Sequence, residues 1–181
     1  MISWMLRRRD LLFLVETLMP GRSDREHTAD LLATDPELIR KMLEDEQLFE
    51  RMMNDQEILL QVSPWLFFNV LLVRVWRDLE QEAFTVERRN RQQVVLFDVD
   101  QVSELMEQEA VRDYMAAMLA SFTRVESVTV RYRVRQGVWR RYRTSELDVN
   151  GMMRFSQNVE EPFRFEPYKR IADACLFLSG M

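Results

Sequence analysis

The longest apolar stretch of the chain covers residues 63–82 and predicts a central, buried helix. Ser63 and Pro64 suit the start of a helix, because the serine hydroxyl accepts a hydrogen bond from a free N–H and proline has no N–H to leave unpaired. Inside the helix, Asn69 is the only polar side chain before Arg74. A helix that is apolar on nearly all sides is buried, and this apolar run is too short to cross a membrane.

Helical spacing of apolar residues predicts several shorter helices around this one. A capping box from Thr34 to Glu37 marks the start of the first of two short amphipathic helices. We expect the break between these two helices near Asp45. The β-branched run at 94–97 predicts one short buried strand. The other expected helices cover residues 8–18, about 100–106, 110–122 and 167–178.

Strict alternation of apolar and polar residues over 127–134 predicts a β-strand. Gln136-Gly137 suits a two-residue turn, because glycine adopts the positive φ that such turns need. Residues 138–143 then return as the second strand of a hairpin. This register places Arg133 opposite Arg140, and two like charges in such a pair repel each other.

From the central helix onward, the expected order is helix, strand, helix, helix, strand, turn, strand, which is the order of a winged helix. We therefore expect a mainly α fold with a small β component, a helical bundle packed on a winged-helix-like unit with one β-hairpin. The expected parts are an acidic helical region at 1–62, a winged-helix-like core at 63–145 and a helical arm at 146–181. The sequence leaves open that the three form one compact domain.

Charge is spread unevenly along the 181 residues, although the net charge is only -5. Residues 24–57 hold eleven acidic and four basic side chains, whereas residues 131–143 hold six arginines and no acid. Arginines on a hairpin can contact phosphates with an affinity that depends on salt and little on sequence. The candidate nucleic-acid or partner-binding residues are Arg131, Arg133, Arg135, Arg140, Arg141 and Arg143.

Two observations weigh against a nucleic-acid reader. The helix expected at 110–122 offers few polar groups for base edges, namely Arg112, Asp113 and Ser121. The overall charge of the chain is also acidic. As an alternative to a binding surface, the arginines could form the solvated face of a sheet and pair with acids of the N-terminal half. Winged-helix units with a poor recognition helix can bind proteins instead, so the fold alone does not decide the function.

Candidate chemistry for an enzyme is sparse, and we predict no catalytic residue, metal site or cofactor. The single cysteine, Cys175, excludes an intramolecular disulfide and suits the cytoplasm. We expect its thiol to be buried on the inner face of the last helix. The only histidine, His27, falls in a polar loop. The carboxylates Asp98, Asp100, Glu104 and Glu107 could be imagined as a hard-cation site. No glycine offers the turn of a calcium loop, helix capping explains the aspartates, and charged helix starts are common, so we predict no metal there.

Aromatic and basic residues alternate near the C-terminus, and they have two interpretations. Such interleaving can stack single-stranded bases. We instead expect an arm that packs its rings onto the core, because aromatic rings are mostly used for burial. The rings belong to Phe155, Phe163, Phe165 and Tyr168.

Together these patterns predict a non-enzymatic, cytoplasmic regulatory protein that associates with nucleic acid through the arginine-rich hairpin. The alternative is a protein-interaction adaptor or homodimeric scaffold whose hairpin faces an acidic partner. Nucleic acid, an acidic protein and a second copy of the chain therefore stay open as partners. We predict no membrane association.

Overall fold

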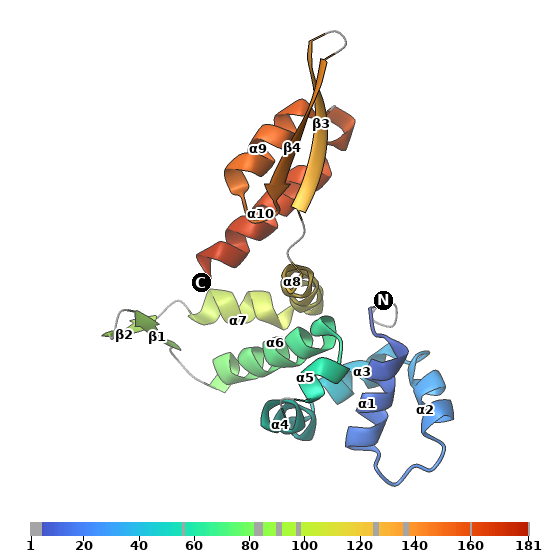
Figure 1. Cartoon of the computed structure of the whole chain (residues 1–181). Helices are drawn as coiled ribbons and strands as arrows, with labels where there is room; N and C mark the ends of the chain where they lie inside the picture. The colour runs from blue at the N-terminus through green and yellow to red at the C-terminus, as the bar shows by residue number, and fades with distance from the viewer. Residues whose placement is uncertain are drawn as a thin grey trace. The chain divides into compact units, whose positions relative to one another are not determined.

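Helices hold most of the described chain in the computed structural model, and the described strands form two separate antiparallel pairs (Figure 1). The structure describes residues 5–55, 57–81, 85–89, 92–96, 99–124, 127–135, 138–159 and 161–180. The chain divides into two units, Met1–Ala120 and Ser121–Met181, and each is considered by itself.

The N-terminal unit is built from helices and one strand pair, and its boundary with the second unit falls in the last turn of α8. Its elements are α1 (Arg8–Leu18), α2 (Arg25–Leu32), α3 (Pro36–Leu43), α4 (Glu46–Asn54), α5 (Ile58–Gln61), α6 (Pro64–Gln81), β1 (Thr85–Arg89), β2 (Gln92–Leu96), α7 (Val99–Glu107) and α8 (Glu109–Phe122).

Helix α6 lies in the hydrophobic core of this unit. Its Leu66 and Val70 are buried in one cluster with Leu14 of α1, Ile39 of α3 and Leu48 of α4. Burial of such side chains stabilises each by about 1.5–3 kcal/mol relative to exposure. The prediction of a central buried helix in this stretch is confirmed.

The stretch that follows Thr34 forms two short helices, α3 and α4, as predicted, whereas the polar loop expected around His27 is instead helix α2. The carboxylate of Asp45 accepts a hydrogen bond from the backbone N–H of Gln47 at 2.9 Å and begins α4. The cap of α3 is Asp35, which accepts from the N–H of Leu38 at 3.0 Å, and not Thr34 as the capping-box pattern predicts. A carboxylate at a helix start also interacts favourably with the helix dipole.

The single short strand expected at 94–97 is in fact part of a strand pair. Strand β2 pairs antiparallel with β1, so that Val86 lies opposite Val95 and Thr85 opposite Leu96. The sequence reading missed β1, because its charged residues do not alternate with apolar ones. Phe97 lies outside the described residues.

The C-terminal unit packs two helices with the second strand pair. Strand β3 (Ser127–Arg135) pairs antiparallel with β4 (Val138–Ser145), and α9 (Val149–Asn158) contacts both β4 and α10 (Phe165–Ser179) (Figure 1). A short 3-10 helix, η1 (Glu161–Phe163), connects α9 to α10.

The fold-class prediction of a helical bundle packed on a winged-helix-like unit is wrong. Helix α6 shares its core with α1, α3 and α4, whereas β3 and β4 belong to the other unit and pack with α9. A second strand pair, β1–β2, separates α6 from α7. The order of elements matched a winged helix, but order does not say which elements share a core.

Candidate functional site

All six candidate arginines lie on β3 and β4, which we call the arginine strand pair. The ladder places Arg131 directly opposite Arg141, and Arg135 opposite Val138. The predicted pairing of Arg133 with Arg140 is wrong, because an irregularity between Arg133 and Arg135 shifts the remaining register by one residue. The expected turn at 136–137 lies outside the described residues.

The side chains of two of these arginines are described, and both are exposed. Arg141 and Arg143 reach solvent, and Nε of Arg143 donates a hydrogen bond to Oγ of Ser127 at 2.7 Å. The side chains of Arg131, Arg133, Arg135 and Arg140 lie outside what the structure describes. Exposed guanidinium groups keep their charge at any physiological pH, and they match phosphate geometry.

The two units carry net charges of opposite sign. Residues 1–120 hold 14 Lys and Arg against 23 Asp and Glu, a net charge of -9. Residues 121–181 hold 11 Lys and Arg against 7 Asp and Glu, a net charge of +4. The arginine strand pair therefore lies in a basic unit, although the whole chain is acidic.

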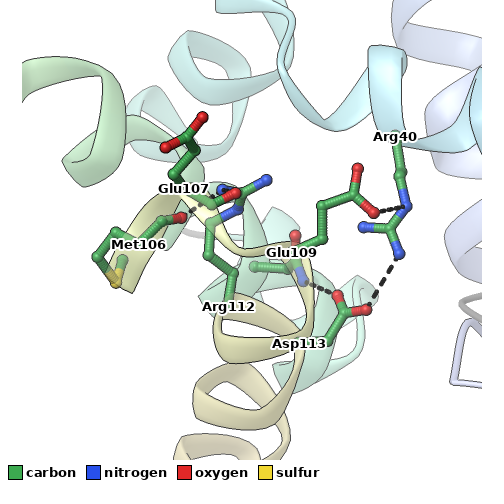
Figure 2. Close-up of polar contacts among 7 residues, drawn as sticks. Arg40, Met106, Glu107, Glu109, Arg112 and Asp113 are labelled. Carbon is green, nitrogen blue, oxygen red and sulfur yellow. Dashed lines mark hydrogen bonds and ion pairs between the residues drawn. The ribbon is translucent and has the colours of Figure 1, made fainter. Parts of the chain in front are cut away.

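A polar cluster inside the N-terminal unit connects three helices (Figure 2). Nε of Arg40 on α3 lies 2.8 Å from the carboxylate of Glu109, and its Nη2 lies 3.3 Å from that of Asp113 on α8. Nδ2 of Asn69 on α6 donates to the same Asp113 carboxylate at 3.0 Å. The buried amide of Asn69 thus has its hydrogen-bond partner on another helix, as buried polar groups in proteins generally have one.

Arg112 is only 6% exposed, and it caps the end of a helix (Figure 2). Its Nη1 donates to the carbonyl oxygen of Met106 and, at 2.9 Å, to that of Glu107, the last residue of α7. Its guanidinium lies 4.3 Å from the ring centroid of Trp76 on α6. Burial lowers the pKa of Arg112, because a charged group is less well solvated there. It thus joins α7, α8 and α6.

The polar groups of α8 are engaged in contacts within the protein. The polar groups that could have read bases are Arg112, Asp113 and Ser121, and all three have partners within the chain. Arg112 and Asp113 are described above, and Ser121 accepts from Nη1 of Arg170 at 2.6 Å. Helix α8 is therefore a structural helix, and it does not offer a base-reading surface built from these groups.

Replacing Arg112 with alanine is expected to lower the free energy of unfolding of the N-terminal unit by about 1–2 kcal/mol. The change leaves the last carbonyls of α7 without their donor and removes the cation from the Trp76 ring. Urea unfolding followed by circular dichroism measures it. Arg112→Met retains the apolar stem, so it should lose less; an Arg112→Ala variant as stable as the parent protein would contradict the assignment.

A buried carboxylate, Asp10, is the main structural residue that the sequence reading missed. It is 0% exposed. One carboxylate oxygen accepts from the N–H of Ser63 at 2.7 Å, and the other from the N–H of Arg7 at 2.8 Å. Asp10 therefore joins the start of α1 to the start of α6. Its only sequence signal is its place on the apolar side of α1, four residues before Leu14.

Two predictions for the C-terminal helix are wrong. Cys175 is exposed and not buried. Phe163 and Phe165 are 68% and 72% exposed, so these rings do not pack onto the core. The inner face of α10 carries Asp173 and Ala174 instead. Asp173 is accommodated there because the ammonium of Lys169 lies 2.9 Å from its carboxylate.

The described residues contain no group of three or more His, Cys, Asp and Glu side chains placed to hold a metal ion. Asp98, one of the acidic residues considered above, lies outside this part of the chain. Within the same residues, every helix is too short or too polar to traverse a bilayer.

Comparison with known proteins adds no relative. No protein-family model matches the chain, and neither a curated protein nor a solved structure matches it.

Proposed function

We propose that the chain is a non-enzymatic, cytoplasmic regulatory protein that associates with nucleic acid through the arginine strand pair. The observation that carries the proposal is the ladder position of Arg131 opposite Arg141, within a segment that has six arginines and no acid. Like charges directly opposite each other destabilise a strand pair. A binding partner with regularly spaced negative charge would offset that cost.

Nucleic acid is the polyanion that fits this arrangement best. Alternate residues of a strand share one face along an extended line, and the ladder places Arg131, Arg141 and Arg143 at positions of the same face. A nucleic-acid backbone likewise presents successive phosphates. The candidate base-reading groups of α8 are engaged elsewhere, so phosphate contacts should dominate and sequence preference should be weak. The presence of one cysteine in 181 residues supports a reducing compartment.

A matched pair of double variants tests the proposal. Arg141→Gln with Arg143→Gln removes two exposed charges from the strand pair, whereas Arg124→Gln with Arg154→Gln removes two exposed charges elsewhere in the same unit. The first variant should reduce the slope of log K against log salt by about two, since each phosphate contact contributes about one. The control should leave it nearly unchanged. Equal slopes in both variants would count against the strand pair.

An acidic protein is the second candidate partner. The negative charge of the N-terminal unit favours a second copy of the chain in this role. A net charge of -9 on one copy complements the +4 of the C-terminal unit on another. Light scattering at low salt should then show a dimer that dissociates at high salt and is absent in the Arg141→Gln, Arg143→Gln variant. A monomer at low salt would eliminate self-association through the strand pair.

A further inference from the structure

A cavity of about 730 Å³ lies within the C-terminal unit, between the end of β4, α9 and the start of α10. Its walls include the rings of Phe155, Phe163 and Phe165. Three charged residues, Glu146, Glu166 and Arg170, also line it. This volume falls in the range of cavities that hold small organic molecules, and such cavities combine apolar walls with a few polar groups.

Phe163 and Phe165 are exposed, but hydrogen bonds of Arg164 fix the connection that carries them. Phe163 ends η1 and Phe165 begins α10, and the residue between them fixes the connection. Nε of Arg164 donates to the carbonyl oxygen of Val159 at 2.8 Å, and its N–H donates to that of Glu161 at 3.2 Å. Two large exposed rings beside one cavity are more than scattered surface apolar residues, and a ligand would cover them.

The positive charge in the wall is already balanced. Arg170 forms an ion pair with Glu146, and both side chains are mostly buried. The guanidinium also donates to Oγ of Ser121 and lies 3.9 Å from the ring centroid of Phe122. Nη1 and Nη2 of Arg170 thus have partners within the protein, and Nε, which has no hydrogen-bond partner among the described residues, is buried. The guanidinium is therefore poorly placed to attract an anion into the cavity.

The negative charge of Glu166, in contrast, is not balanced by an ion pair within the described residues. Its carboxylate is exposed at the cavity, and in the described residues it has no ion-pair partner. With the Glu146–Arg170 pair neutral overall, the described residues that line the cavity carry one net negative charge. The faces of phenyl rings are also electronegative and attract cations within about 6 Å. Rings and carboxylate therefore favour the same kind of ligand.

We propose that this cavity binds a small organic cation with an apolar body, of the alkylammonium class. The phenyl rings would cover the alkyl groups and face the cation, and Glu166 would supply the counter-charge. This inference is independent of nucleic-acid binding, because neither Arg141 nor Arg143, the two arginines of the strand pair whose side chains are described, lines the cavity.

An NMR titration of the full chain with three ligands of similar shape tests the proposal. The probes are choline, its uncharged analogue 3,3-dimethyl-1-butanol, and the anion 3,3-dimethylbutanoate. Choline should bind about tenfold more tightly than the alcohol, the ratio expected for a cation over aromatic faces with a nearby carboxylate. Tighter binding of the anion, or binding of none of the three, would overturn the proposal.

Variants then assign the binding to the cavity. Glu166→Gln should remove most of the preference for choline over the alcohol, whereas Phe163→Ala should weaken both. Both side chains are exposed, so the fold should tolerate the changes. Leu176→Ala is the control, because this residue is 51% exposed on α10 and does not line the cavity. Unchanged choline binding in both Glu166→Gln and Phe163→Ala would contradict the assigned site.

Discussion

Replacing all six arginines of the strand pair with glutamine is expected to remove most of the affinity for labelled duplex DNA. Arg131, Arg133, Arg141 and Arg143 occupy ladder positions on one face of the strand pair. Each neutralised phosphate contributes about 0.9 to the slope of log K against log salt on duplex DNA, so loss of these four contacts reduces that slope by about four. With four contacts, raising salt from about 50 to about 200 mM lowers affinity by about 10²-fold. Fluorescence anisotropy across this range measures both quantities.

A second set of replacements separates charge from structure. Arginine-to-lysine changes at the same six positions keep the positive charge, so the salt slope should be retained even if bidentate phosphate contacts are lost. The glutamine variant should also be as stable as the parent or more stable by about 0.2–1 kcal/mol, because the repulsion between Arg131 and Arg141 is gone. A glutamine variant that unfolds would show that the arginines stabilise the fold instead.

Replacing Asp10 with alanine is expected to cost the N-terminal unit about 3 kcal/mol of stability. The N–H of Ser63 would be left buried without its acceptor, and the N–H of Arg7 would lose its own. Hydrogen bonds to a charged group contribute about 1.5–3 kcal/mol each, and leaving a buried donor unpaired adds a desolvation cost. Urea unfolding, followed by the fluorescence of the buried Trp65, measures the change.

Two further variants make the Asp10 prediction specific. Asp10→Asn keeps one acceptor oxygen and should lose less than Asp10→Ala. Asp30→Ala removes an exposed carboxylate that pairs with Arg8 at 3.4 Å, and exposed ion pairs contribute about 0–1 kcal/mol. If Asp10→Ala were no more destabilising than Asp30→Ala, the proposed junction between α1 and α6 would be wrong.

The sequence predicted the features that depend on local pattern. An apolar run with a serine and a proline at its start specifies α6, and Asp45 between two amphipathic segments specifies the break before α4. The register of the arginine strand pair could not be predicted in full. Arg135 lies opposite Val138, as the register expected from the sequence implies, but the irregularity after Arg133 is not encoded in the alternation of apolar and polar residues.

The features that the sequence could not predict depend on contacts between distant segments. Asp10 and Ser63 are 53 positions apart, and the pattern of α1 alone only places a charge on its apolar side. The inner face of α10 was assigned wrongly, because Lys169 pairs with Asp173 and makes a charged residue acceptable inside. The cavity lined by Phe163 and Glu166 could not be predicted from sequence, because it forms only where three elements pack together.

We propose that the basic C-terminal unit binds a nucleic-acid backbone. The most direct test is the anisotropy of labelled duplex DNA and single-stranded RNA titrated with the unmodified chain, at low salt and at about 0.15 M salt. We predict binding at low salt that weakens steeply as salt is raised and that changes little between unrelated sequences. Absence of binding to either nucleic acid at low salt would contradict the claim.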